Sequence, residues 1–195
     1  MPSLYIIFHA VYCANISFLI LIALLSGLVW SYLSAYLIPT KTRFIHTYNF
    51  VLLFIFTLAI VFYTMLDRSN NVYTLHLTPF HSFRDALQNR ELYRSMFMNC
   101  LLFYPFGLFF GCLLMKHPLP GLAALLGLAI LLSGGIEVWQ YLAHAGDADI
   151  DDVLCNVFGA LVGYGVAVAG IPLLPRLKAL AAKLQPFFKR IFHSQ

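Results

Sequence analysis

Charged side chains are scarce in this sequence. Only 10% of the 195 residues are Asp, Glu, Lys or Arg, whereas 61% are apolar. Soluble domains carry about a quarter charged residues, because their surface must be hydrated. The scarcity excludes a soluble globular domain and a disordered chain. The formal net charge of +4 is small, and it excludes a basic nucleic-acid-binding domain.

Several signatures of catalytic and metal sites are also missing. The sequence has no Gly-x-Ser-x-Gly nucleophile elbow and no phosphate-binding P-loop. Its four cysteines and seven histidines lack the C-x-x-C and H-x-x-x-H spacings of zinc sites. Two minor alternatives stay open, because the residues concerned are expected at a similar depth in a membrane or on the same side of it. They are a Cys100–Cys155 disulfide and a zinc site that draws on His76, His81 and His144.

Long apolar runs take the place of charged surface. The hydrocarbon core of a bilayer needs about 20 apolar residues per helix. Five stretches meet this length, at about 15–38, 48–66, 96–115, 119–142 and 152–174. The predicted fold is an all-α membrane protein, a bundle of about five transmembrane helices.

This pattern divides the chain into four parts. Two N-terminal transmembrane helices (1–66) are followed by an outer loop or interfacial segment (67–95), a three-helix core (96–174) and a basic cytoplasmic tail (175–195). The tail has apolar residues at helical spacing and only basic charges, which predicts a basic amphipathic helix on the inner leaflet. We expect Pro186 to kink it.

The distribution of Lys and Arg predicts the orientation. One face of the five-span bundle receives eight basic residues and no acidic ones, from Lys41 to Arg190. The other face receives four arginines and all the acids outside the spans. Cytoplasmic loops are the ones rich in Lys and Arg. We therefore expect an integral protein of a bacterial cytoplasmic membrane, with its N-terminus outside and its C-terminus cytoplasmic.

Polar side chains within the spans gather near the predicted outer ends. They come from the third, fourth and fifth spans, and they are Asn99, Glu137, Gln140, Asp152 and Asn156. Ionisable groups inside a membrane are costly and usually functional. The sequence therefore predicts a site that three helices form at the level of the outer leaflet.

Some of these residues have an alternative interpretation. Asn and Gln often only join helices, and this holds for Asn99 and Gln140 taken alone. Gly159 and Gly163 are four residues apart, which favours close helix packing. If the fifth helix begins early enough to include Asp149, one helical stripe carries Asp149, Asp152, Asn156, Gly159 and Gly163. Asp149 and Asp152 could share Mg²⁺ or Ca²⁺ with a lipid phosphate, or could only stabilise the N-terminus of the fifth helix.

Four ordered motifs carry a family resemblance. They are LTPF (77–80), NCLLFYPFG (99–107), EVWQ (137–140) and DIDDVLCNVFGALVGY (149–164). In this order and at this spacing they resemble the VanZ-like family of integral membrane proteins. The resemblance covers about residues 75–164, with the first two spans and the tail outside it.

The resemblance implies a protein of the cell envelope associated with resistance to the glycopeptide teicoplanin, and it implies no settled reaction. The family commonly has an Arg where this chain has Gly146. That departure weakens any mechanism in which an Arg holds a phosphate at this point. Arg84, Arg90 or Arg94 could supply the charge instead.

We expect a VanZ-like envelope protein that binds or modifies a lipid-linked or phosphate-bearing molecule at the outer leaflet. The expected partners are membrane lipids and a lipid-linked cell-wall precursor. Whether the protein is an enzyme stays open, as do two alternatives, a non-catalytic accessory subunit and a small transporter or flippase. The expected roles are general base for Glu137, metal ligands for Asp149 and Asp152, and substrate contacts for Asn99, Gln140, Asn156 and Arg94.

Overall fold

The computed structural model describes residues 16–65, 74–114 and 116–192. Nearly all of them are helical, which confirms the all-α fold. The helices are α2 (Ile16–Met65), α3 (His81–Ala86), α4 (Arg90–Leu114), α5 (Pro118–Leu142) and α6 (Ile150–Phe192). Two short strands, β1 (Leu75–His76) and β2 (Ala148–Asp149), complete the described chain.

Four segments of the described helices are long and apolar enough to cross a membrane. They are Arg43–Thr64, Arg90–Leu114, Pro118–Leu142 and Ile150–Gly170. They correspond to the second to fifth predicted spans. The first predicted span, 15–38, falls on the start of α2, where most side chains lie outside the described residues. A fifth crossing therefore stays a prediction.

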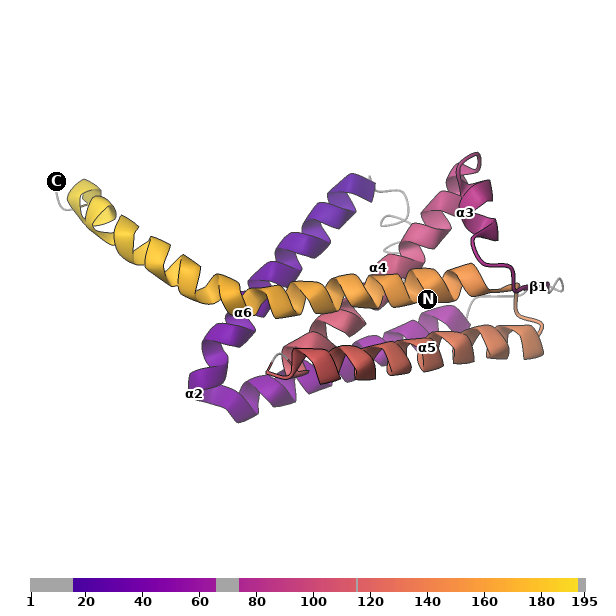
Figure 1. The fold of residues 1–195 in the computed structure, drawn as a ribbon, viewed down its shortest axis with the longest axis horizontal. Helices are drawn as coiled ribbons and strands as arrows, with labels where there is room; N and C mark the ends of the chain where they lie inside the picture. Colours follow the sequence, from indigo (N-terminus) through magenta and orange to yellow (C-terminus); the bar gives the residue numbers. More distant parts are fainter. Residues whose placement is uncertain (1–15, 66–73, 115, 193–195) are drawn as a thin grey trace, which may run out of the picture.

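Helix α2 consists of two arms that meet at a sharp bend (Figure 1). Pro39 lies inside this helix, and a proline removes a backbone hydrogen bond and allows a kink. One side-chain bond joins the arms, because the indole N–H of Trp30 donates to Oδ1 of Asn49 at 2.9 Å. The first arm also packs closely on α4, where Gly27 leaves room for the Tyr104 hydroxyl.

Helices α4 and α6 pack in parallel through glycines. A Cβ on Gly159 would overlap the carbonyl of Cys100, and a Cβ on Gly163 would overlap the carbonyl of Tyr104. From the other side, Gly107 brings α4 equally close to the backbone of α6. Small residues let helix backbones approach in this way. The predicted packing role of Gly159 and Gly163 is confirmed.

Helix α5 runs back alongside α6 in the opposite direction (Figure 1). Its buried residues close one apolar core with α2, α4 and α6, made of Ile60, Phe103, Phe106, Phe110, Leu125, Ala129, Ile136, Ala160 and Tyr164. Two parallel helices joined by an antiparallel one place the starts of α4 and α6 beside the end of α5. The polar residues predicted on three spans therefore share one end of the bundle.

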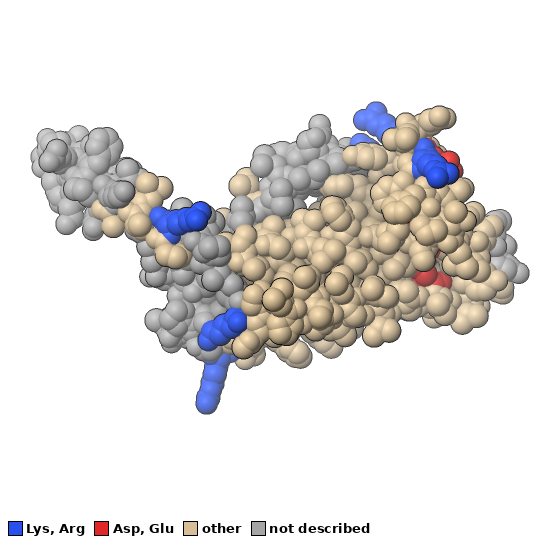
Figure 2. Space-filling view, in the orientation of Figure 1, with Lys and Arg blue, Asp and Glu red and all other residues tan. Residues whose placement is uncertain are grey.

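The two ends of the bundle differ in charge. We call one the acidic end, because it carries every Asp and Glu among the described residues: Asp85, Glu91, Glu137, Asp147, Asp149, Asp151 and Asp152. The other is the basic end, where Arg43, Lys116 and Arg176 are the basic residues whose side chains the structure describes. Figure 2 shows red side chains only at the acidic end, with blue ones at both ends. This is the asymmetry on which the predicted orientation rests.

Helix α6 differs from the expected fifth span at both of its ends. It begins at Ile150, so Asp149 belongs to β2 and does not lie on the helical stripe predicted for it. At the other end it continues to Phe192 and extends beyond the bundle (Figure 1). The predicted tail helix is thus a continuation of α6, and its place on a leaflet stays a prediction.

The glycine contact predicts a stability difference between two substitutions in one helix. Gly159→Ala should lower the free energy of unfolding by about 1–3 kcal/mol, because the new methyl group forces α6 away from Cys100. Gly165→Ala is the control, since no atom lies within 4 Å of a Cβ built there. It should be neutral or stabilising, because Ala favours helix over Gly. Thermal unfolding in mild detergent measures both, and equal unfolding temperatures would contradict the contact.

Candidate functional site

A small parallel sheet fastens two distant connections to each other at the acidic end. Leu75 of β1 pairs with Ala148 of β2, and His76 pairs with Asp149. The backbone N–H of Ala148 also donates to the carbonyl of Thr74 at 2.9 Å. The connection that leads into α4, residues 74–89, is therefore fixed to the connection between α5 and α6. We call residues 74–89 the α3 segment.

Asp151 holds the start of α3. Its Oδ1 accepts the N–H of Phe80 at 2.6 Å, and its Oδ2 accepts the N–H of Ser82 at 2.8 Å. The first N–H groups of a helix have no partner within it, and a negative charge there is favourable. Asp151 stands in the first turn of α6 and is fully buried, yet its carboxylate caps α3.

Asp149 extends this capping into a network. Its Oδ1 accepts the N–H of Asp151 at 2.8 Å, and its Oδ2 accepts a short hydrogen bond from the Ser82 hydroxyl. Its own N–H donates to Oε2 of the buried Glu137 at 3.0 Å. We call Glu137, Asp149, Asp151 and Ser82 the carboxylate network. It joins α5, β2, α6 and the α3 segment.

A second set of hydrogen bonds joins Asp147 to the α3 segment. Oδ1 of Asp147 accepts the N–H of Thr74 at 2.8 Å and the Thr74 hydroxyl at 2.6 Å. The same hydroxyl lies 2.8 Å from Nε2 of His76, whose ring stacks on that of His81. Within the described residues, no three His, Cys, Asp or Glu side chains form a group that could hold a metal ion.

Two buried polar side chains lie deeper between α5 and α6. Asn156 is 4% exposed, and its Nδ2 donates to the hydroxyl of the fully buried Ser133 at 2.8 Å. The other amide atom of Asn156, Oδ1, has no hydrogen-bond partner. If the amide were turned over, the nitrogen would be the atom left without a partner. A buried polar group without a partner costs about 1–3 kcal/mol.

Gln140 joins helices. Its Nε2 donates to the carbonyl of Thr64 at 3.2 Å, which links α5 to the end of α2. This bond fits the alternative in which Gln140 only holds helices together.

Asn99 and Arg94 lie half-buried on α4. In the α4–α6 contact, Cys100 of α4 lies beside Gly159 of α6. Because the two helices run in the same direction, Arg94, six residues before Cys100, lies at the level of Val153, six residues before Gly159 and near the start of α6. Arg84, in the last turn of α3, and Arg90, at the start of α4, are exposed at the same end. The predicted site residues thus share one end of the bundle, without all touching one another.

Ser82, Thr74, Ser133 and Asp151 are not among the site residues predicted from the sequence. The partners of these residues lie far away in the chain, so spacing could not identify them. One local signal was available, because Ser82 follows Pro79 and Phe80 at a helix start. The described cysteines Cys100, Cys112 and Cys155 form no disulfide, so the bridge between Cys100 and Cys155 is not found.

The backbone conformation at position 146 explains why this chain has Gly there and not the Arg common in the family. Its φ is 143°, in the region that favours glycine, and the residue is buried in the turn before β2. The preceding turn ends α5, with the N–H of Ala145 donating to the carbonyl of Gln140 at 2.9 Å. An Arg side chain at this position would require a different turn.

Comparison with known proteins gives one match. The family model described as VanZ/LLP1 matches residues 44–173. The match includes the four motifs and also the second arm of α2, which the sequence analysis had placed outside the resemblance. Neither the curated proteins nor the solved structures yielded a match.

The capping of α3 predicts a local effect of one substitution. Asp151→Asn should speed hydrogen exchange across residues 74–89, because charge-assisted bonds to two backbone N–H groups weaken by about 1.5–3 kcal/mol. The control is Asp85→Asn on α3 itself, whose carboxylate faces only an exposed His81 at 3.7 Å. Equal exchange in both variants would show that the α3 segment does not depend on Asp151.

The turn at Gly146 predicts the result of introducing the family's arginine. Gly146→Arg should lower the free energy of unfolding by about 1–3 kcal/mol, since a non-glycine residue is strained at this φ. Ala143→Arg adds the same charge at an exposed residue with a φ of −84° and serves as the control. Thermal unfolding compares them, and a Gly146→Arg protein as stable as its control would refute the explanation.

Proposed function

The chain is a membrane protein that belongs to the VanZ/LLP1 family, and we propose that its acidic end binds a lipid-linked, phosphate-bearing molecule of the outer leaflet. The arginines at this end contact the phosphate. The buried polar pair Ser133–Asn156 contacts a hydroxyl of the bound molecule, or a water that binds together with it. The carboxylate network holds the α3 segment beside this site.

The observation that carries the proposal is the incomplete hydrogen bonding of the buried Asn156 side chain. A membrane protein keeps buried polar groups hydrogen-bonded, because no water replaces a missing partner in the hydrocarbon core. Asn156 is almost fully buried and has one amide atom unpaired, as has Asn49 on α2, and of the two Asn156 is the one beside the acidic end. A hydroxyl both donates and accepts, so it satisfies the amide in either orientation. A ligand that brings a hydroxyl to this depth supplies the missing partner.

The charges at this end support a phosphate. Within the described residues, Arg84 and Arg90 form no ion pair, and both are exposed. Guanidinium groups suit phosphate because they donate several hydrogen bonds in one plane. Asp149 and Asp151, by contrast, have both carboxylate oxygens bonded to N–H or O–H groups of the protein. The acids are thus occupied while these two arginines are available.

The α3 segment supports a location at the membrane surface. Its exposed apolar side chains include Leu77, Phe80, Phe83 and Leu87. Aromatic and apolar residues beside basic ones are typical of a segment at the boundary between headgroups and acyl chains. Arg84 lies in this same segment, so its guanidinium group is at the depth where lipid phosphates lie.

The main role of the carboxylates in this proposal is structural, because they hold the binding surface in place. Glu137 accepts the N–H of Asp149, and Asp149 holds Ser82, so both stabilise the binding surface. Catalysis by Glu137 is the enzymatic form of the same proposal, whereas the bonds to both oxygens of Asp149 argue against Mg²⁺ or Ca²⁺ shared by Asp149 and Asp152. Capture of a lipid-linked cell-wall precursor would connect this site to glycopeptide susceptibility.

Native mass spectrometry of the whole chain in mild detergent tests phosphate binding. We expect adducts with a long-chain prenyl phosphate and at least about tenfold weaker ones with the matching prenyl alcohol. Arg84→Gln/Arg90→Gln should remove most of this preference. Arg176→Gln, at the basic end, should keep it. A wild-type protein that binds both probes equally would overturn the proposal.

Asn156→Leu separates a ligand contact from helix joining. If Asn156 bonds a hydroxyl of the ligand, the variant should bind a prenyl diphosphate-linked sugar, which carries such hydroxyls, more weakly and be as stable as the wild type or more so. Its stability should hold because an unpaired polar atom has been removed. If Asn156 only joins helices, the variant should be less stable with unchanged binding. Loss of the prenyl phosphate's phosphate group on wild-type protein, but not on Glu137→Gln, would establish turnover.

A further inference from the structure

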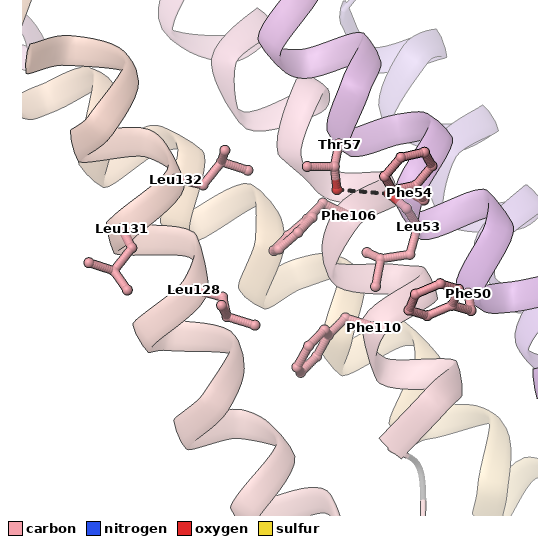
Figure 3. A pocket seen from close by; sticks show the side chains of 9 residues that line it. All are labelled: Phe50, Leu53, Phe54, Thr57, Phe106, Phe110, Leu128, Leu131 and Leu132. Carbon is pink, nitrogen blue, oxygen red and sulfur yellow. Dashed lines mark hydrogen bonds between the residues drawn. The ribbon is translucent and has the colours of Figure 1, made fainter. Parts of the chain in front are cut away.

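An apolar groove opens between α2, α4 and α5, away from the residues of the proposed site (Figure 3). Its volume is about 460 Å³, within the usual range of ligand pockets. Nine side chains line it: Phe50, Leu53, Phe54, Thr57, Phe106, Phe110, Leu128, Leu131 and Leu132. Thr57 is the one polar side chain among them, and its hydroxyl is bonded to the Leu53 carbonyl at 2.8 Å. The groove therefore offers a bound molecule only hydrocarbon contacts.

Toward the acidic end, α2 and α5 are joined by the bond from Gln140 to the carbonyl of Thr64, and neither residue lines the groove. Nearer the basic end, Phe106 and Phe110 of α4 lie between the two helices, as Figure 3 shows. Phe50 and Leu131, on opposite walls, are 61% and 73% exposed. The groove is thus open sideways to the hydrocarbon region of the membrane.

Basic groups lie at the end toward which the groove runs. On α2, Arg43 precedes Phe50 by seven residues, or two helical turns, and so lies on the same helix face. On the other side, Lys116 and His117 lie in the connection between α4 and α5, and both are exposed. Within the described residues this end of the bundle carries no Asp or Glu. A hydrocarbon wall that ends in cations complements a lipid with an anionic headgroup.

We propose that this groove binds an acyl chain of an anionic phospholipid of the same membrane, with the lipid phosphate held at Arg43 and Lys116. The site is separate from the one proposed at the acidic end and takes a different ligand. It lies at the end that the positive-inside rule assigns to the cytoplasmic leaflet, where anionic lipids gather. The bound lipid fills the space between α2 and α5 and stabilises the bundle.

The test compares two lipids with identical acyl chains, phosphatidylglycerol and phosphatidylcholine, added to the whole chain in mild detergent. Native mass spectrometry should show tighter binding of phosphatidylglycerol. Each basic residue near an anionic group adds about fivefold. Arg43→Gln/Lys116→Gln should therefore bring the two lipids to nearly equal affinity, whereas Arg176→Gln, on helix α6, which does not line the groove, should leave the preference intact.

A second pair of variants tests the groove itself. Leu128→Trp places a large ring among the lining residues and should weaken binding of both lipids. Val138→Trp adds the same ring to an exposed residue of α5 that does not line the groove, and it should bind as the wild type does. Equal wild-type affinity for the two lipids would overturn the proposal. So would a preference that survives loss of Arg43 and Lys116, or a Leu128→Trp variant that binds like Val138→Trp.

Discussion

The close contact between α4 and α6 determines the arrangement of the other elements. Gly159 and Gly163 let the backbone of α6 lie on the carbonyls of Cys100 and Tyr104, which fixes both the parallel direction and the register of the two helices. Between two parallel neighbours the connecting helix must run back, so α5 is antiparallel to both. The beginnings of α4 and α6 then lie beside the end of α5. At this end α5 meets the start of α6, where Asn156 donates to Ser133 and the N–H of Asp149 donates to Glu137.

The sequence predicted whatever depends on local pattern. Apolar runs gave the positions of the spans, and helical spacing gave the packing of Gly159 and Gly163. The grouping of polar residues at one end followed from the order of the spans. It did not predict contacts between distant residues. Asp151 caps a helix 69–71 residues earlier in the chain, at Ser82 and Phe80, and two-residue strands such as β1 and β2 have no periodicity to recognise. Asp149 was expected on a helix face for the same reason, since only the β1–β2 pairing shows where α6 begins.

The two ends of the bundle have opposite chemistry. At the acidic end, carboxylates are bonded to backbone and hydroxyl donors, and exposed arginines lie beside them. At the basic end, cations stand next to an apolar groove with no described acid nearby. A membrane protein meets two headgroup regions of different composition, and we propose that this chain has a distinct surface for each. The first combines a fixed segment with a buried amide that has one unpaired atom, while the second is a groove lined by apolar side chains.

Photo-crosslinking with a prenyl phosphate that carries a diazirine next to its phosphate tests the central claim most directly, because it reports where the headgroup lies. The account predicts labelled peptides from the α3 segment, the first turns of α4 and the start of α6, all displaced by unlabelled prenyl phosphate. Labelling confined to the basic end, or labelling at the acidic end that unlabelled prenyl phosphate does not displace, would contradict it.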